Sequence, residues 1–150
     1  MDSKFTSNPN DFQYEILPEK TIEYDLSFKV IVIGDTGVGK SCLTVRGIKN
    51  VFENVKDTTI GFEFFTLMIK FINEQQIIKL QIWDTCGQEI YRSLVTNFYR
   101  SATLAFIVYS LDNYQSFKNI DVWLREIRTN SSPEVKIILI GNKKDLEDER

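Results

Sequence analysis

The sequence predicts an α/β fold, a three-layer sandwich in which helices cover a mostly parallel sheet that carries one antiparallel edge hairpin. Short apolar segments rich in β-branched residues, at 28–33, 103–111 and 137–140, alternate with segments of helical character. Strands that alternate with helices form parallel sheets with right-handed crossovers. The loops that follow such strands meet at one edge of the sheet, where ligands bind in this architecture.

Local sequence patterns predict the remaining helices and strands. A helix is expected over 39–49, directly after the first strand, and a shorter one over 90–100. Two apolar segments at 60–71 and 76–83, separated by a short polar turn, predict the antiparallel hairpin. Over 114–130 the apolar residues recur at the spacing of one amphipathic helix. These residues are Phe117, Ile120, Trp123, Leu124 and Ile127.

Composition limits the kind of protein. The chain has 150 residues, a net charge of −3 and two cysteines, and it has no histidine. The negative charge argues against a nucleic-acid binder, and the lack of histidine argues against a zinc site or a histidine-dependent triad. We expect a polar, flexible N-terminal extension over 1–26. One domain, monomeric by default, is expected over 27–150.

The sequence GDTGVGKS at 34–41 matches the GxxxxGK[ST] pattern of a phosphate-binding loop. Glycines let backbone N–H groups turn inward around an anion, and the helix that follows points its N-terminus at the phosphates. Lys40 is expected to reach the β- and γ-phosphates, and the Ser41 hydroxyl to bind Mg²⁺. The predicted fold is therefore that of a P-loop NTPase.

The sequence GNKKD at 141–145 follows another buried strand and predicts which base is bound. The carboxylate of Asp145 can accept two hydrogen bonds from the N1–H and N2–H₂ edge of guanine, whereas adenine offers no such pair of donors. A P-loop ATPase or a small-molecule kinase is the alternative, and it requires Asn142 to Asp145 to be a chance match.

Two further segments, WDTCGQE and DTTIGFEF, are candidates for Mg²⁺ and γ-phosphate binding. Asp84 follows a strand and can hold Mg²⁺ through water. Gly87 offers a bare backbone N–H to a γ-phosphate, and the amide of Gln88 could orient an attacking water. Thr59 stands where a loop hydroxyl could complete the Mg²⁺ shell.

Together these segments resemble the small GTPases of the Ras superfamily, and within it the Rab family. The similarity is carried by GDTGVGKSC, TIGFEF, WDTCGQE, FYRSATLAFIVYSL and GNKKDLE, and it runs from about Tyr24 to the end of the chain. It implies GTP or GDP as the ligand, with Mg²⁺.

The resemblance also implies a role for each matching residue. The catalytic residues would be Gln88, Lys40 and Thr59. The Mg²⁺ ligands would be Ser41, Thr59 and Asp84. The nucleotide would be bound by Asp35, Thr36, Gly37, Val38, Gly39, Lys40, Ser41, Cys42, Phe52, Thr59, Gly87, Asn142, Lys143 and Asp145.

The family's function would be that of a slow GTP hydrolase acting as a molecular switch in intracellular vesicle and membrane traffic. GTP would order two switch regions, Thr59–Phe64 and Gln88–Phe98, which would meet effectors, an exchange factor and a GTPase-activating protein. No arginine stands in the phosphate loop or shortly before Thr59, so the activating protein is expected to supply catalytic groups. Core packing and contact with effectors explain one aromatic set equally well: Phe64, Trp83 and Phe98.

Two features depart from the family pattern. Cys86 replaces the usual alanine, and the chain reaches Arg150 without the family's Ser-Ala-Lys-type loop, last strand and helix, or prenylated C-terminal cysteines. We therefore expect a truncated domain, cytoplasmic, with no membrane anchor of its own; a longer prenylated form would reach the cytoplasmic face of endomembranes. The alternative function is a non-hydrolysing interaction module that sequesters the partners of Rab proteins.

Overall fold

The computed structural model describes residues 13–52, 61–85 and 98–146, and a six-stranded sheet forms the centre of this part of the chain. The strands lie in the order β1-β3-β4-β2-β5-β6. Pairing of β2 with β4 and β5, and of β5 with β6, is parallel, while β3 pairs antiparallel with β1 and β4. The strand bounds are β1 (Tyr14–Leu17), β2 (Leu26–Ile33), β3 (Phe62–Phe71), β4 (Gln76–Thr85), β5 (Leu104–Ser110) and β6 (Lys136–Asn142).

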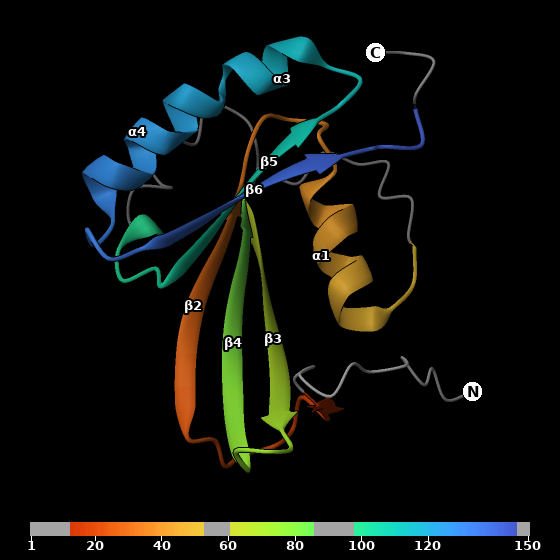
Figure 1. The fold of residues 1–150 in the computed structure, drawn as a ribbon, viewed down its shortest axis with the longest axis vertical. Coiled ribbons are helices and arrows are strands. Elements are labelled where there is room, and N and C mark those ends of the chain that lie inside the picture. Colours follow the sequence, from red (N-terminus) through yellow and green to blue (C-terminus); the bar gives the residue numbers. More distant parts are fainter. Residues whose placement is uncertain (1–12, 53–60, 86–97, 147–150) are drawn as a thin grey trace.

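Helices cover both faces of the sheet, as Figure 1 shows. On one face lies α1 (Lys40–Lys49), and on the other lie α3 (Tyr114–Lys118) and α4 (Ile120–Asn130). Successive side chains of a strand point to opposite faces, so each central strand contributes to two cores. In β2, Ile31 and Ile33 pack in the cluster with α4, while Val32 packs in the cluster that includes Leu43 of α1. The predicted three-layer α/β sandwich is confirmed.

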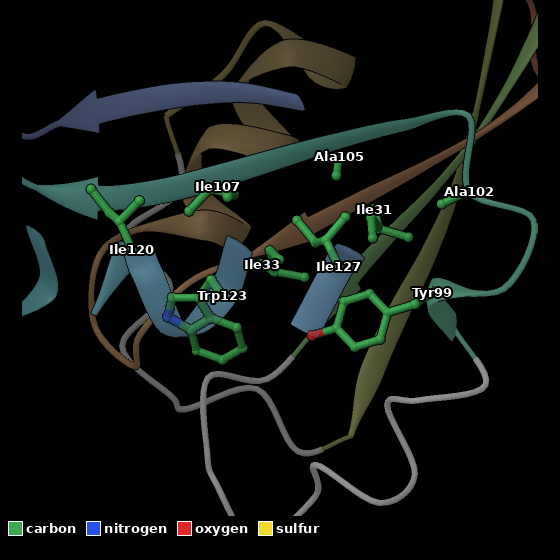
Figure 2. Close-up of a cluster of buried hydrophobic side chains, with 9 residues drawn as sticks. All are labelled: Ile31, Ile33, Tyr99, Ala102, Ala105, Ile107, Ile120, Trp123 and Ile127. Atoms are coloured by element: carbon green, nitrogen blue, oxygen red, sulfur yellow. The ribbon is translucent and has the colours of Figure 1, made fainter. Parts of the chain in front are cut away.

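The larger core lies between the sheet and α4. Figure 2 shows Trp123 and Ile127 of α4 facing Ile31 and Ile33 of β2, with Ala105 and Ile107 of β5 beside them. These side chains are at most 5% exposed. Burying a large apolar side chain is worth about 1.5–3 kcal/mol, so this cluster fixes α4 firmly on the strands that lead into the site.

The N-terminal segment differs from the expected flexible extension. Residues Tyr14–Leu17 form β1, which pairs with Met68 to Phe71 of β3, and Ile72 donates its N–H to the carbonyl of Gln13 at 2.9 Å. The hairpin of β3 and β4 is therefore not at the edge of the sheet. The free edge of β3 offers backbone groups that must be paired, and a segment more than 50 residues away supplies them. Local periodicity does not reveal such a non-local pairing.

The helix expected over 114–130 is interrupted at Asn119, which ends α3 and begins α4. Asn113 caps α3 by accepting hydrogen bonds from the N–H groups of Gln115 and Ser116. Most of the short helix expected over 90–100 lies outside the described residues. No helix in the described part of the chain is long and apolar enough to cross a membrane.

Candidate functional site

Three predicted segments meet at the carboxyl ends of the parallel strands. The phosphate loop, residues 34–39, follows β2, while Asp84 lies near the end of β4 and Asn142 ends β6. The register aligns them, because Val32 of β2 pairs with Asp84 and Ser110 of β5 pairs with Asn142. Segments that are far apart in the sequence thus lie at one edge of the sheet.

The phosphate loop closes around the side chain of Lys40. The buried ammonium donates hydrogen bonds to the backbone carbonyls of Gly34, at 2.9 Å, and Asp35, at 2.7 Å. Gly34 has a φ of 141°, and a Cβ at this position would overlap the carbonyl of Val108 on β5, so only glycine allows this approach. These two backbone carbonyls hold the ammonium inside the loop, where it can attract an anion.

A hydrogen bond joins the GNKKD segment to the phosphate loop. The side-chain Nδ2 of Asn142 donates to the carbonyl of Val38 at 2.9 Å, across 104 positions of sequence. Gly39 adopts a φ of 95°, and a Cβ there would overlap the same amide of Asn142. The two segments are therefore in direct contact, and Gly39 leaves room for this contact.

Beyond Asn142 the GNKKD segment is more exposed. The ammonium of Lys143 lies 3.5 Å from Oδ2 of Asp112, and the hydroxyl of Ser110 donates to Oδ1 of Asp112. The Ser110 hydrogen bond is the main reason that the pKa of Asp112 is lowered, and the charge of Lys143 adds to it. Asp145 is exposed to solvent, where it can meet an incoming ligand.

Asp84 is a buried carboxylate, with 0% of its surface exposed. Burial raises its pKa to about 6; the Ser41 hydroxyl and the Lys40 charge act in the opposite direction, and Glu63 adds to the increase. Among the described residues, neither carboxylate oxygen has a partner with ordinary hydrogen-bond geometry. A buried anion normally needs a countercharge. A hard oxygen ligand of this kind next to a serine hydroxyl fits Mg²⁺.

The side chain of Asp35 points away from the phosphate loop. Its Oδ2 accepts a hydrogen bond from Nδ2 of Asn119 at 2.7 Å, and its Oδ1 accepts one from the indole Nε1 of Trp123 at 2.8 Å. Asp35 was predicted to bind the nucleotide, but its side chain contacts the α3–α4 junction. The sequence did not suggest Asn119, and it assigned Trp123 to the apolar stripe; only its indole N–H hinted at a polar partner.

Comparison with known proteins agrees with this geometry. The Ras family model matches residues 29–150, which is most of the chain. This chain belongs to the Ras family. It is 48% identical to the Ras-related protein Rab-11B of Dictyostelium discoideum over 131 residues and 45% identical to the Ras-related protein RABA1c of Arabidopsis thaliana over 124 residues. The predicted resemblance to Rab-type members of the Ras superfamily is confirmed.

The Ras-family chain spans a little over half the length of these relatives. The match covers 87% of this chain and 59% of the Dictyostelium protein, and 83% of this chain and 56% of the Arabidopsis protein. A third relative, the Ras-related protein YPT3 of Nicotiana plumbaginifolia, is 45% identical over 83% of this chain and 56% of its own length.

Aromatic side chains of β3 and β4 cluster with Phe98 in this Ras-family chain. The ring of Phe62 lies 4.4 Å from that of Phe98 and 5.2 Å from that of Trp83, and the ring of Phe64 lies 4.9 Å from that of Trp83. Phe62 and Phe64 remain 45% and 46% exposed. The rings therefore pack against one another, as core packing requires. Phe62 and Phe64 also leave an exposed apolar surface, as contact with a partner would require.

Several predicted residues lie outside the part of the chain that the structure describes: Thr59, Cys86, Gly87 and Gln88. Among the described ones, Thr36 and Gly37 at the tip of the loop are exposed, and Cys42 on α1 is half-buried. Phe52 follows α1 with 73% of its surface exposed. Its ring is therefore accessible to a ligand.

Proposed function

We propose that this chain binds GTP and GDP with Mg²⁺, hydrolyses GTP slowly, and acts as a molecular switch in intracellular vesicle and membrane traffic. The observation that carries the proposal is the hydrogen bond from Asn142 to the carbonyl of Val38. It joins a loop suited to phosphates to a loop suited to guanine, so that both could contact one nucleotide. Membership of the Ras family, with Rab-type relatives at 45–48% identity, supports the same assignment.

Different described residues would bind different parts of the nucleotide. The buried ammonium of Lys40 would bind the β- and γ-phosphates, and the backbone N–H groups of the phosphate loop would surround them. Asp145 would accept hydrogen bonds from the guanine edge, while the aliphatic part of Lys143 would cover one face of the base. By resemblance, Gly87 would contact the γ-phosphate and Gln88 would orient the attacking water.

Ser41, Asp84 and, by resemblance, Thr59 would hold Mg²⁺. The bound ion would supply positive charge that neutralises the phosphate oxygens. For Asp84 this pairing would also offset the cost of a buried carboxylate. The same ion would make nucleotide affinity and the protonation of Asp84 interdependent.

The switch would operate through order and disorder of the two regions that include Thr59 and Gln88. Contacts to the γ-phosphate and Mg²⁺ would order them, and hydrolysis would release them. An exchange factor, a GTPase-activating protein and effectors would recognise the two states, in part through the exposed rings of Phe62 and Phe64. The activating protein would raise the rate roughly 10³–10⁵-fold.

Displacement of a fluorescent GDP analogue tests this function directly. We expect GTP and GDP to displace the analogue, a large excess of ATP to leave it bound, and chelation of Mg²⁺ to speed its release. Equal displacement by ATP would contradict guanine recognition. Absence of binding would favour the interaction module that sequesters Rab partners. Rapid multiple-turnover hydrolysis by the chain alone would contradict the slow switch.

A further inference from the structure

The carboxylate of Asp35 connects the phosphate loop to the helices on the far side of the sheet. Asp35 follows Gly34 in the phosphate loop. A residue that binds phosphate is normally neutral or positive, so a negative side chain is unexpected here. Its two oxygens accept hydrogen bonds from Asn119 and Trp123, which lie 84 and 88 positions further along the chain. We call these three residues the Asp35 latch.

Electrostatics explains why the carboxylate faces the helices. A carboxylate turned into the loop would repel a polyphosphate, at a cost that grows as water is excluded from the site. The amide N–H of Asn119 and the indole N–H of Trp123 draw it the other way, and hydrogen bonds to charged groups are stronger than neutral ones. The loop can therefore carry a negative residue without placing its charge at the ligand.

The helix end of the latch is anchored in the core. Trp123 is 5% exposed and packs in the cluster with Ile31, Ile33 and Ile127 (Figure 2). Asn119 stands at the break between α3 and α4, and its own side-chain Oδ1 accepts a hydrogen bond from Gln115. Because both donors are fixed by surrounding contacts, they hold the position of Asp35.

The loop end of the latch reaches the lysine. The carbonyl of Asp35 accepts a hydrogen bond from the ammonium of Lys40 at 2.7 Å. A shift of the Asp35 backbone, which the side-chain hydrogen bonds oppose, would displace this carbonyl and with it the ammonium. The other arm of the loop is fixed separately, where the carbonyl of Val38 accepts from Asn142.

We propose that Asp35 is a positioning residue for nucleotide binding, which holds Lys40 through its carbonyl while Asn119 and Trp123 hold its carboxylate. This inference rests on the proposed nucleotide-binding function and adds a link that couples the phosphates to α3 and α4. A consequence is that the indole N–H of Trp123 reports on whether the phosphate loop is occupied.

The first experiment measures the dissociation of a fluorescent GDP analogue from the full 150-residue chain. In Asp35→Asn the new amide NH₂ faces the N–H group of Asn119 or Trp123, so one hydrogen bond is lost. We expect dissociation to be about tenfold faster, which is the effect of one hydrogen bond to a charged group. Trp123→Phe keeps most of the ring and should give a similar change. In the double variant the two effects should not add, because both remove the same link.

A reciprocal exchange separates positioning from general damage. In the double variant Asp35→Asn with Asn119→Asp, the amide at position 35 can donate to the new carboxylate and accept from Trp123. We expect this exchange to restore most of the affinity that Asp35→Asn loses. The matched control is Tyr99→Phe, which removes a hydrogen bond of 3.0 Å to Glu126 on α4 without touching the loop. An equal effect of this control, or no rescue by the exchange, would overturn the proposal.

The second experiment follows the indole N–H resonance of Trp123 by NMR, assigned with Trp123→Phe. We expect inorganic pyrophosphate or GDP to shift this resonance in the wild-type chain, and Asp35→Ala to abolish the response. If GDP fails to bind but pyrophosphate shifts the indole, the proposed guanine function fails and the latch stands. If GDP binds and the indole does not respond, the latch fails and the proposed function stands. If neither ligand produces a shift, the latch is overturned.

Discussion

The phosphate side and the guanine side of the candidate site differ in how firmly the fold holds them. The phosphate loop follows β2, a strand with neighbours on both sides, and Val38 and Lys40 are buried. The GNKKD segment follows β6, which ends the sheet in the described part of the chain. Ile138 and Leu139 of β6 are 46% and 49% exposed. The residues proposed to bind phosphates are therefore held by the core, while those proposed to recognise the base lie on an exposed segment.

The largest expected effect comes from Lys40, which lies on the phosphate side of the candidate site. Lys40→Ala removes a buried ammonium, and we expect GDP affinity and pyrophosphate affinity to fall together by about 100-fold or more. Titration of each ligand checks this. The matched control is Lys49→Ala, an exposed lysine at the other end of α1. A loss confined to GDP would contradict the placement of Lys40 at the phosphates.

Asp84 tests the same side through pH. Its pKa of about 6 in the fold exceeds the value near 3.9 of an unfolded chain, so the folded state binds this proton more tightly. The ionised carboxylate therefore destabilises the Mg²⁺-free protein above about pH 6, by roughly 3 kcal/mol, and this cost disappears as the pH falls toward about 4.

Asp84→Asn removes the titrating charge. We expect the Mg²⁺-free variant to be more stable than the wild type near neutral pH, by about 2–3 kcal/mol, with the difference shrinking toward about pH 4. Urea denaturation over a pH series measures it, with the exposed Asp121→Asn on α4 as the control. The same Asp84 variant should lose the effect of Mg²⁺ on nucleotide affinity. A pH-independent difference would show that Asp84 is not the group responsible.

Asp145 probes the guanine side alone. Asp145→Asn should weaken GDP binding by about ten- to 100-fold, since two hydrogen bonds to a charged acceptor are altered. Pyrophosphate affinity should stay unchanged, because the phosphate loop is untouched. Competition with both ligands measures the two values in one series. A parallel loss of pyrophosphate affinity would remove the distinction between the two sides.

The smallest effect is expected from Asp112, whose ion pair with Lys143 is partly exposed. Asp112→Ala should release Lys143 and remove a negative charge near the base, so GDP affinity should rise by no more than about threefold. Added salt should erase the difference. Ser110→Ala, which removes the hydroxyl that bonds Asp112 but keeps the ion pair, is the control. Weaker GDP binding by Asp112→Ala would show that the pair supports the site.

Much of the fold was predictable because its signals are local. The strand before Gly34, the helix after it and the hairpin of β3 and β4 follow from runs and periods within about ten residues. The break at Asn119 and the strand at Tyr14–Leu17 were not foreseen. A cap and its local hydrogen bonds decide the first, and the unpaired edge of β3 decides the second.

The sequence by itself determined the chemistry of the two loops. The proposed phosphate binding depends on glycines and a lysine at fixed spacing, and the proposed guanine recognition depends on one carboxylate two residues after Lys143, so short sequence motifs predict both. Only the tertiary structure decided where the carboxylate of Asp35 points. Its partners, Asn119 and Trp123, reach it because α4 packs on β2. Contacts across 84 and 88 positions arise from the packing of layers, and no local pattern records them.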